Sequence, residues 1–261
     1  MSPAEPLPYL DSAVPLAFAH RGFSPPGSAV ENSLQAFRAA VELGFDYLET
    51  DLRTSSDGVL MVFHDETLDR ATDGSGKISE HTLAELSRLR IGGAEPIPSF
   101  EQLVAEFPET KINFDVKDSA GVAPLVEIIE RFSLHDRICV ASFSDARRRS
   151  VLSRLRKRTA SSGGMWSIAA FVLFSAWTPR RWLKRLLHDV DCLQVPVRAG
   201  ILPVVTRKSV HRAHLLGLKL HVWTINDKPE MHRLFDLGVD GVMTDRADLL
   251  AEVMHERGYW H

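Results

Sequence analysis

Two histidines follow apolar runs in which a strand would end. His20 comes after the run 16–19, and His64 comes after the run 59–63. An imidazole changes its charge near neutral pH, so one can take a proton from a nucleophile while another gives one to a leaving group. A lone histidine at a strand end is more often structural. A pair at adjacent strand ends, beside carboxylates, favours catalysis, and we predict that His20 and His64 form an acid–base pair.

Three carboxylates are placed where they can converge on the same site. Glu49 and Asp51 are two residues apart, so on a strand both side chains point to one face. Asp115 stands in the same way two residues before Lys117 on a later strand. Buried carboxylates need a cation or basic partners, and oxygen ligands suit Mg²⁺ or Ca²⁺ better than zinc. We therefore predict one divalent cation held by Glu49, Asp51 and Asp115, the alternative being a solvent-facing pair on an edge strand.

Basic side chains accompany these carboxylates. Arg21 follows His20, and its forked guanidinium can hold phosphate oxygens, as can the ammonium of Lys117. Both also balance the acidic charge, and the two roles are compatible. Glu31 precedes Asn32 and Ser33, either of which would cap the first helix. We therefore predict that Glu31 either faces the metal or His20 from behind the ligands, or belongs only to the helix start.

Two aromatic residues lie in the same strand-end positions. Phe143 ends one predicted strand, and Trp223 lies near the end of another. Either could form an apolar wall for an alcohol or glycerol group, and core filling explains them equally well. We include both as candidate substrate contacts.

Strand-like apolar runs alternate with helical patterns along the chain. The predicted strands are 16–19, 46–52 with a hairpin extension at 59–63, 112–116, 138–143, 159–162, 193–197, 218–225 and 241–244. The predicted helices are 33–43, 82–89, 99–107, 123–132, 145–157, 167–187 with a possible break at Pro179, 206–216, 229–237 and 247–257. Eight strand–helix units predict a (β/α)₈ barrel, in which chemistry occurs at the C-terminal strand ends. A doubly wound sheet is the alternative, but no G-x-G-x-x-G loop follows the first strand.

Residues 66–98 break the alternation and predict a small insertion after the second strand, within a single domain spanning residues 1–261. The net charge of −3 gives no indication of a nucleic-acid partner. Cys139 and Cys192 are expected to be reduced core residues. The other nine histidines, such as His211 and His255, are expected on helices or loops at the surface.

The start of the chain, residues 1–15, has four prolines and no apolar core, so we predict an irregular segment without a signal peptide and a cytoplasmic protein. The most apolar stretch, 168–177, is too short to cross a bilayer, which takes about 20 residues. We expect it to be a buried helix start, with membrane contact as the weaker alternative and no stable membrane anchor. The sequence does not indicate an oligomeric state.

An ordered set of motifs resembles the glycerophosphodiester phosphodiesterase family. The set comprises His20-Arg21-Gly22, Glu31-Asn32-Ser33, Glu49-Thr50-Asp51, His64-Asp65 with Leu68, Arg70 and Thr72, then Asp115-x-Lys117, Ser142-Phe143, residues 222–226, residues 238–241 and Thr244-Asp245. Each motif alone is weak, but the ordered set is specific and covers residues 16–250.

The resemblance implies a (β/α)₈ barrel with an insertion after strand two. It implies hydrolysis of glycerophosphodiesters, such as glycerophosphocholine, to sn-glycerol 3-phosphate and an alcohol. His20 and His64 would be the acid–base pair, Glu49, Asp51 and Asp115 the metal ligands, and Arg21 and Lys117 the phosphate contacts.

Two departures leave alternatives open. The family usually has Glu where this chain has Asp115, which shortens the reach of that ligand. The apolar stretch 164–177 leaves a lipid-like substrate open, so a lysophospholipase D acting on lysophospholipids is the alternative function. A non-catalytic phosphate-binding barrel is a third hypothesis, which predicts a missing acid, base or ligand; none is missing by residue type.

Overall fold

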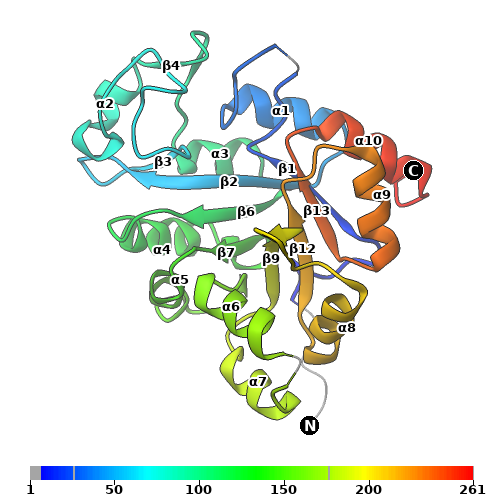
Figure 1. The fold of residues 1–261 in the computed structure, drawn as a ribbon. Helices are drawn as coiled ribbons and strands as arrows, with labels where there is room; N and C mark the ends of the chain where they lie inside the picture. The colour runs from blue at the N-terminus through cyan, green and yellow to red at the C-terminus, as the bar shows by residue number, and fades with distance from the viewer. Residues whose placement is uncertain (1–6, 26, 176, 261) are drawn as a thin grey trace.

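The computed structural model describes residues 7–25, 27–175 and 177–260. Eight parallel strands form a nearly closed barrel, in the spatial order β8-β7-β6-β2-β1-β13-β12-β9, with helices between them (Figure 1). The strands are β1 (Leu16–His20), β2 (Tyr47–Thr54), β6 (Lys111–Val116), β7 (Ile138–Ala141), β8 (Ala160–Ser161), β9 (Cys192–Pro196), β12 (Lys219–Trp223) and β13 (Gly241–Thr244). The predicted barrel is confirmed.

Helices cover the outside of the barrel, and most of them bury apolar side chains against it. They are α1 (Leu34–Glu42), α3 (Phe100–Glu106), α4 (Val122–Arg131), α5 (Asp145–Leu152), α6 (Met165–Phe174), α7 (Arg180–Leu186), α8 (Arg207–Leu216), α9 (Lys228–Leu237) and α10 (Ala247–Glu256), with a short 3₁₀ helix η2 (Leu134–Asp136). The core is continuous between these helices and the strands, and its aliphatic side chains hold the strand ends in register.

Strand register brings the polar residues to one level. His20 of β1 is paired with Glu49 of β2, and Asp51 of β2 is paired with Asp115 of β6. Because neighbouring parallel strands place paired residues side by side, this register alone gathers the predicted site.

The predicted fifth strand is the weakest part of the barrel wall. β8 has only two residues, and a single bridge from Ser162 to Cys192 connects this side of the barrel to β9.

The insertion after β2 is present where the sequence predicted it. β3 (Leu60–Val62) pairs antiparallel with β2 and leads into η1 (Ile78–Glu80), α2 (Leu83–Leu86), β4 (Arg90–Ile91) and β5 (Glu95–Pro96). This segment has a small core of its own, with Leu68, Ile78 and Leu86 fully buried.

Three local predictions differ from the structure. The helix predicted for 145–157 ends at Leu152, and two basic residues beyond it form ion pairs outside the helix: Arg156 with Glu130 and Lys157 with Asp136. The helix predicted for 167–187 begins at Met165, two residues earlier, and the break that we considered at Pro179 is present, because α6 ends at Phe174 and α7 begins directly after Pro179. A hairpin of β10 (Arg198–Ala199) and β11 (Leu202–Pro203) follows β9 and was not predicted.

The expectation that the apolar stretch begins a buried helix is wrong. Among the described residues of 168–177 only Phe171 is buried, whereas Leu173 is 59% exposed and Phe174 is 55% exposed. The helix is apolar on all sides, but the barrel can cover only one side of it. Among the described residues, no helix is long and apolar enough to cross a membrane.

The assignment of all remaining histidines to surface helices or loops is also wrong. His221 lies on β12, is fully buried and packs 4.9 Å from the ring of Phe18. His135 is buried as well and lies 3.2 Å from Glu130. His211 and His255 are exposed on helices, as predicted.

The remaining predictions concern the cysteines and the start of the chain. Cys139 and Cys192 are free and buried, as expected, with their sulfur atoms 3.8 Å apart. The start of the predicted irregular segment, residues 1–6, lies outside the described residues; residues 7–15 contain no helix or strand. Tyr9 is buried there, and its carbonyl oxygen accepts a hydrogen bond from the Tyr47 hydroxyl.

Candidate active site

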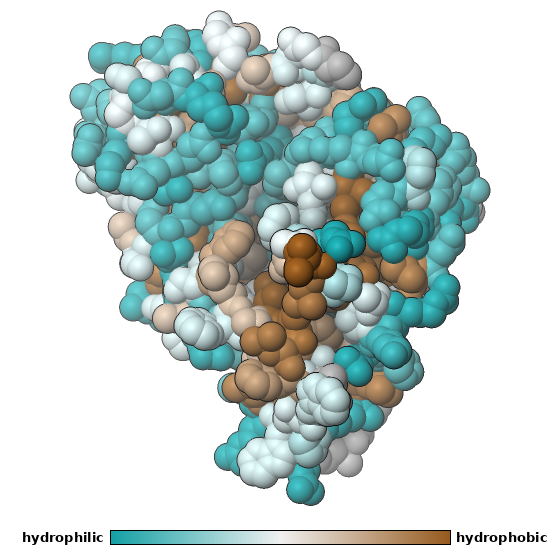
Figure 2. All heavy atoms as spheres, in the orientation of Figure 1, coloured by the Kyte–Doolittle hydropathy of each residue, from teal (hydrophilic) through white to brown (hydrophobic). Residues whose placement is uncertain are grey.

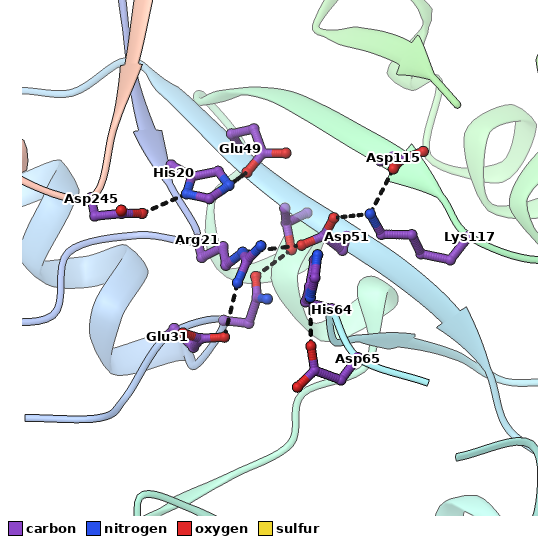
Figure 3. A network of polar contacts seen from close by, with 12 residues as sticks. His20, Arg21, Glu31, Glu49, Asp51, His64, Asp65, Asp115, Lys117 and Asp245 are labelled. Atoms are coloured by element: carbon purple, nitrogen blue, oxygen red, sulfur yellow. Dashed lines mark hydrogen bonds and ion pairs between the residues drawn. The ribbon is translucent and has the colours of Figure 1, made fainter. Parts of the chain in front are cut away.

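A cavity of about 580 Å³ opens at the C-terminal ends of the strands. Its polar lining includes every predicted catalytic, phosphate-binding and metal-binding residue: His20, Arg21, Glu49, Asp51, His64, Asp115 and Lys117. Figure 3 shows these side chains pointing toward one another from β1, β2, β6 and the loop after β3.

Lys117 neutralises two of the carboxylates. Its Nζ lies 2.8 Å from Asp51 Oδ1 and 2.7 Å from Asp115 Oδ2 (Figure 3). Burial favours the neutral form of Asp51, but Lys117 and Arg21 outweigh it, so the pKa of Asp51 is lowered. Burial dominates at Asp115, where the pKa is raised despite Lys117.

Glu49 is the least compensated carboxylate of the site. Its side chain is almost fully buried, and its nearest cationic partner is His20, with 3.6 Å between Nε2 and Oε2. Burial raises the pKa of Glu49 to about 7, although His20 acts against the shift. A proton and a cation would therefore compete for this group near neutral pH.

Arg21 forms ion pairs with Asp51, one of the predicted metal ligands, and with Glu31, which precedes α1. Its Nε lies 3.3 Å from Asp51 Oδ2, and its Nη1 lies 3.1 Å from Glu31 Oε1. Glu31 also pairs with Arg70 at 2.6 Å, so it contacts these arginines rather than His20. It does not line the cavity.

His20 is oriented by a carboxylate from the last strand of the barrel. Its Nδ1 lies 2.5 Å from Asp245 Oδ1, and Asn226 donates a hydrogen bond to the other oxygen of Asp245 at 2.8 Å. A carboxylate only accepts, so Nδ1 carries the proton and Nε2 is left to face the cavity. Burial lowers the pKa of His20, but Glu49 and the Asp245 hydrogen bond outweigh it, and the pKa is raised.

His64 has a similar arrangement on the insertion side. Its Nδ1 lies 2.6 Å from Asp65 Oδ1, and Asp65 is paired with Arg70 at 2.5 Å. Burial acts against the charge of Asp65, but hydrogen bonds from Arg70 and His64 lower its pKa to about 2. Both imidazoles therefore use Nδ1 for orientation and keep Nε2 available for proton transfer.

A tight turn after β1 positions His20 and Arg21. Gly22 has φ +81°, and a Cβ at this position would lie 2.6 Å from the backbone carbonyl carbon of Ala36 in α1. Only glycine permits this approach. Ser33, one of the two predicted caps, begins α1 by accepting a hydrogen bond from the Ala36 amide.

The donor set is suited to a hard divalent cation. Each of the three carboxylates keeps one buried oxygen without a hydrogen bond in the described structure: Glu49 Oε2, Asp51 Oδ2 and Asp115 Oδ1. Such oxygens are costly when they bind nothing. Among the described residues, no group of three His, Cys, Asp or Glu side chains is arranged closely enough to hold a metal ion as it stands. Lys117 lies between Asp51 and Asp115. The chemistry fits an all-oxygen site, with Lys117 supplying part of the positive charge.

The two predicted aromatic contacts line the same cavity. Phe143 is 55% exposed, with Lys117 Nζ 5.5 Å from its ring centre. Trp223 is partly buried at the end of β12, lines the cavity and also packs against a separate cluster of buried side chains that includes Phe18 and Met243.

Asp245, Asp65 and Asn226 were not predicted as site residues. Each belongs to a motif that the sequence made visible, since Asp65 follows His64 and Asp245 ends the last strand. The pairing of Asp245 with His20 joins residues 225 positions apart. It depends on the barrel closing β13 against β1.

The parallel barrel and its site, with imidazoles beside buried carboxylates and fixed cations, define a barrel hydrolase suited to phosphate esters. The model of the glycerophosphoryl diester phosphodiesterase family matches residues 20–249. The chain belongs to this family and is an enzyme of its class, a phosphoric diester hydrolase.

Individual relatives agree with this assignment. The chain is 38% identical to "Probable glycerophosphodiester phosphodiesterase 2" of Mycobacterium tuberculosis, over 94% of this chain and 92% of that protein. It is 26% identical to the human "Lysophospholipase D GDPD1", over 91% of this chain and 85% of that protein. A phosphodiesterase of Oleispira antarctica, solved with the product sn-glycerol-3-phosphate, has a TM-score of 0.76 at 25% identity, covering 93% of this chain and 97% of that chain.

Proposed function

We propose that this enzyme hydrolyses glycerophosphodiesters to sn-glycerol 3-phosphate and an alcohol, with one divalent cation and with His20 and His64 as the acid–base pair. The observation that carries the proposal is the gathering of both imidazoles and three buried carboxylates in one cavity at the strand ends. The relatives named glycerophosphodiester phosphodiesterase and the product in the Oleispira structure support the substrate class. The lysophospholipase D alternative is not favoured, because the similarity to the human enzyme of that name is lower. The cytoplasmic location stays a prediction.

The reaction needs one proton removed and one delivered. The nucleophile, either water or the 2-hydroxyl of the substrate, gives its proton to the Nε2 of one imidazole. Attack by water gives glycerol 3-phosphate directly, whereas attack by the 2-hydroxyl gives a cyclic phosphate, which a water molecule must then open with the two proton roles reversed. The leaving alkoxide takes a proton from the Nε2 of the other, so charge does not accumulate on either oxygen. Asp245 and Asp65 hold the two rings in the orientation that this exchange requires.

Fixed positive charges bind the phosphate. Arg21 and Lys117 line the cavity and offer N–H groups to the phosphate oxygens as well as to the carboxylates. Glu49, Asp51 and Asp115 would hold the cation, which supplies Lewis-acid polarisation of the phosphoryl group and neutralises its developing charge. Phe143 and Trp223 would contact the apolar part of the alcohol or glycerol group.

Release of glycerol 3-phosphate from glycerophosphocholine tests the reaction directly. We expect release with Mg²⁺ or Ca²⁺ and none with EDTA. Undiminished release in EDTA would contradict the metal requirement, and no release by folded protein with either ion would contradict the substrate.

A matched pair of variants tests whether Asp51 is a metal ligand or acts only through its ion pair with Arg21. Asp51 and Glu31 both pair with Arg21, but only Asp51 belongs to the proposed ligand set. We expect Asp51→Asn to abolish calorimetric binding of the metal, whereas Glu31→Gln retains it. Equal losses in both variants would mean that Arg21, and not a ligand, had been disturbed.

A further inference from the structure

The surface formed by α6, α7 and the tip of the β10–β11 hairpin is unusually apolar; we call it the α6–α7 face. Trp166 is 82% exposed, Trp177 is 88% exposed and Ile201, at the hairpin tip, is 92% exposed. Figure 2 shows hydrophobic side chains gathered over this part of the molecule, while most of the remaining visible surface is hydrophilic.

Most of the exposed large apolar side chains are concentrated there. Among the described residues, every such side chain except Phe132, Phe143 and Leu215 falls within residues 165–202. They contribute little to folding because they stay in water, and a contiguous exposed patch of this kind marks an interaction site.

The same surface carries positive charge without acidic partners. α7 exposes Arg180, Arg181, Lys184 and Arg185, and residues 163–188 contain no Asp or Glu. None of these four cations forms an ion pair within the described part of the chain, whereas Asp189, just after α7, is paired with Arg148 and Arg149 of α5. A basic cluster is unexpected in a chain whose net charge is −3, and it indicates an anionic partner.

Tryptophan and arginine side by side suit one partner chemistry in particular. Trp182 lies among the four cations of α7 and is 56% exposed. Indole rings favour the interfacial layer of a bilayer, and Lys or Arg beside them bind anionic head groups. Both helices are too short to cross a membrane but long enough to lie on it.

A second copy of the chain fits this surface less well. A two-fold symmetric contact places the same patch on both sides, so the four cations of α7 would face four like charges. Anionic lipid has the complementary charge.

We propose that the α6–α7 face docks this enzyme reversibly on the surface of an anionic lipid bilayer. Trp166, Trp177 and Ile201 enter the interface, and the cations of α7 contact the head groups. Leu173 of α6 is exposed on this face and also lines the catalytic cavity, so the mouth of the cavity lies beside the docked surface. The docking does not depend on the proposed metal or acid–base chemistry.

Flotation with vesicles tests the proposal. Wild-type protein is expected to bind phosphatidylcholine vesicles that contain about a third phosphatidylglycerol, and to release as salt is raised. It is expected to bind vesicles of phosphatidylcholine alone at least about tenfold less. Brominated lipid in the anionic vesicles should quench the tryptophan fluorescence.

Two double variants address the two components of the surface. Arg181→Glu with Arg185→Glu, and Trp166→Ala with Trp177→Ala, should each weaken binding at least about tenfold. A variant with Arg88→Glu and Arg154→Glu is the matched control, because it changes the net charge equally at exposed sites outside this face. Hydrolysis of a water-soluble diester should stay unchanged in all of them, which shows that each is folded.

Several results would overturn the proposal. Wild type that floats with neither vesicle, or equally with both, has no anionic docking surface. An equal loss in the Arg88 and Arg154 control would mean that only net charge matters. Protein that is dimeric by light scattering, becomes monomeric in the tryptophan variant and ignores vesicles would assign the face to a second copy.

Discussion

The polar floor of the catalytic cavity, which contains Asp51, Asp115 and Lys117, and the α6–α7 face differ in how their charges are compensated. On the floor, Asp51, Asp115 and Lys117 are largely removed from water, and each lies within 3 Å of an opposite charge. On the α6–α7 face, the cations of α7 are exposed and have no partner among the described residues.

The difference shows how burial constrains function. A buried charge needs its partner at all times, so the floor must be built with fixed geometry by the strands. An exposed charge is stabilised by water and needs no permanent partner within the protein, so two short helices outside the barrel wall can carry it.

The largest expected effect is a loss of turnover when either histidine of the cavity is replaced. His20→Ala and His64→Ala should each lower kcat for glycerophosphocholine by about 10²–10⁴, because general acid–base transfer is lost. Thermal melts and circular dichroism should stay close to wild type. Near-wild-type turnover in both variants would refute the assignment.

Within α6, one substitution should be costly and another nearly neutral. Phe171→Ala is expected to lower the free energy of unfolding by about 3–5 kcal/mol, because Phe171 is 1% exposed and leaves a cavity. Trp166→Ala on the same helix should change it by less than about 0.5 kcal/mol. Urea denaturation measures both. A large loss of unfolding free energy in Trp166→Ala would mean that this side chain stabilises the fold instead of being available to a binding partner.

Asp245→Asn tests whether Asp245 positions the imidazole of His20 for catalysis. Asp245 positions His20 without reaching the cavity, so we expect kcat to fall by about 10–100-fold. The variant removes an interaction that raises the pKa of His20, so the limb of the pH–rate profile that reports His20 should move to lower pH. Asp65→Asn is the control, since it acts on His64 and should leave that limb in place. An unmoved limb in Asp245→Asn would contradict the pairing.

The smallest expected effect is the pH dependence of metal affinity. In the metal-free enzyme the pKa of Glu49 is about 7, so below this pH a proton occupies the proposed ligand. Affinity for Mg²⁺ or Ca²⁺ should therefore fall about tenfold from pH 8 to pH 6, as protons displace the cation. Titration calorimetry measures this. Glu49→Gln should bind more weakly with a flatter pH dependence, and an unchanged dependence in that variant would remove Glu49 from the ligand set.

Sequence reasoning predicted the barrel, the insertion and the charged and histidine residues that line the cavity, but not the uncharged polar ones, such as Asn113, Ser162 and Gln194. It succeeded because each of the charged and histidine residues is tied to a strand end, and parallel strands bring their ends to one side. It failed for α6, because an apolar helix has the same composition whether it is buried or exposed. It also failed for His221, which lies within a strand that the sequence itself predicted.

What the sequence determined by itself was the order of strands and helices and the residue types at the strand ends. The i, i+2 spacing of Glu49 and Asp51 and the glycine at position 22 are local features, and local geometry fixes their consequences. Only the tertiary structure decided that Asp245 orients His20, that Lys117 lies between two carboxylates and that the tryptophans of the α6–α7 face stay in water. These contacts depend on barrel closure and on how much of each helix the barrel can cover, and both depend on packing across the whole molecule.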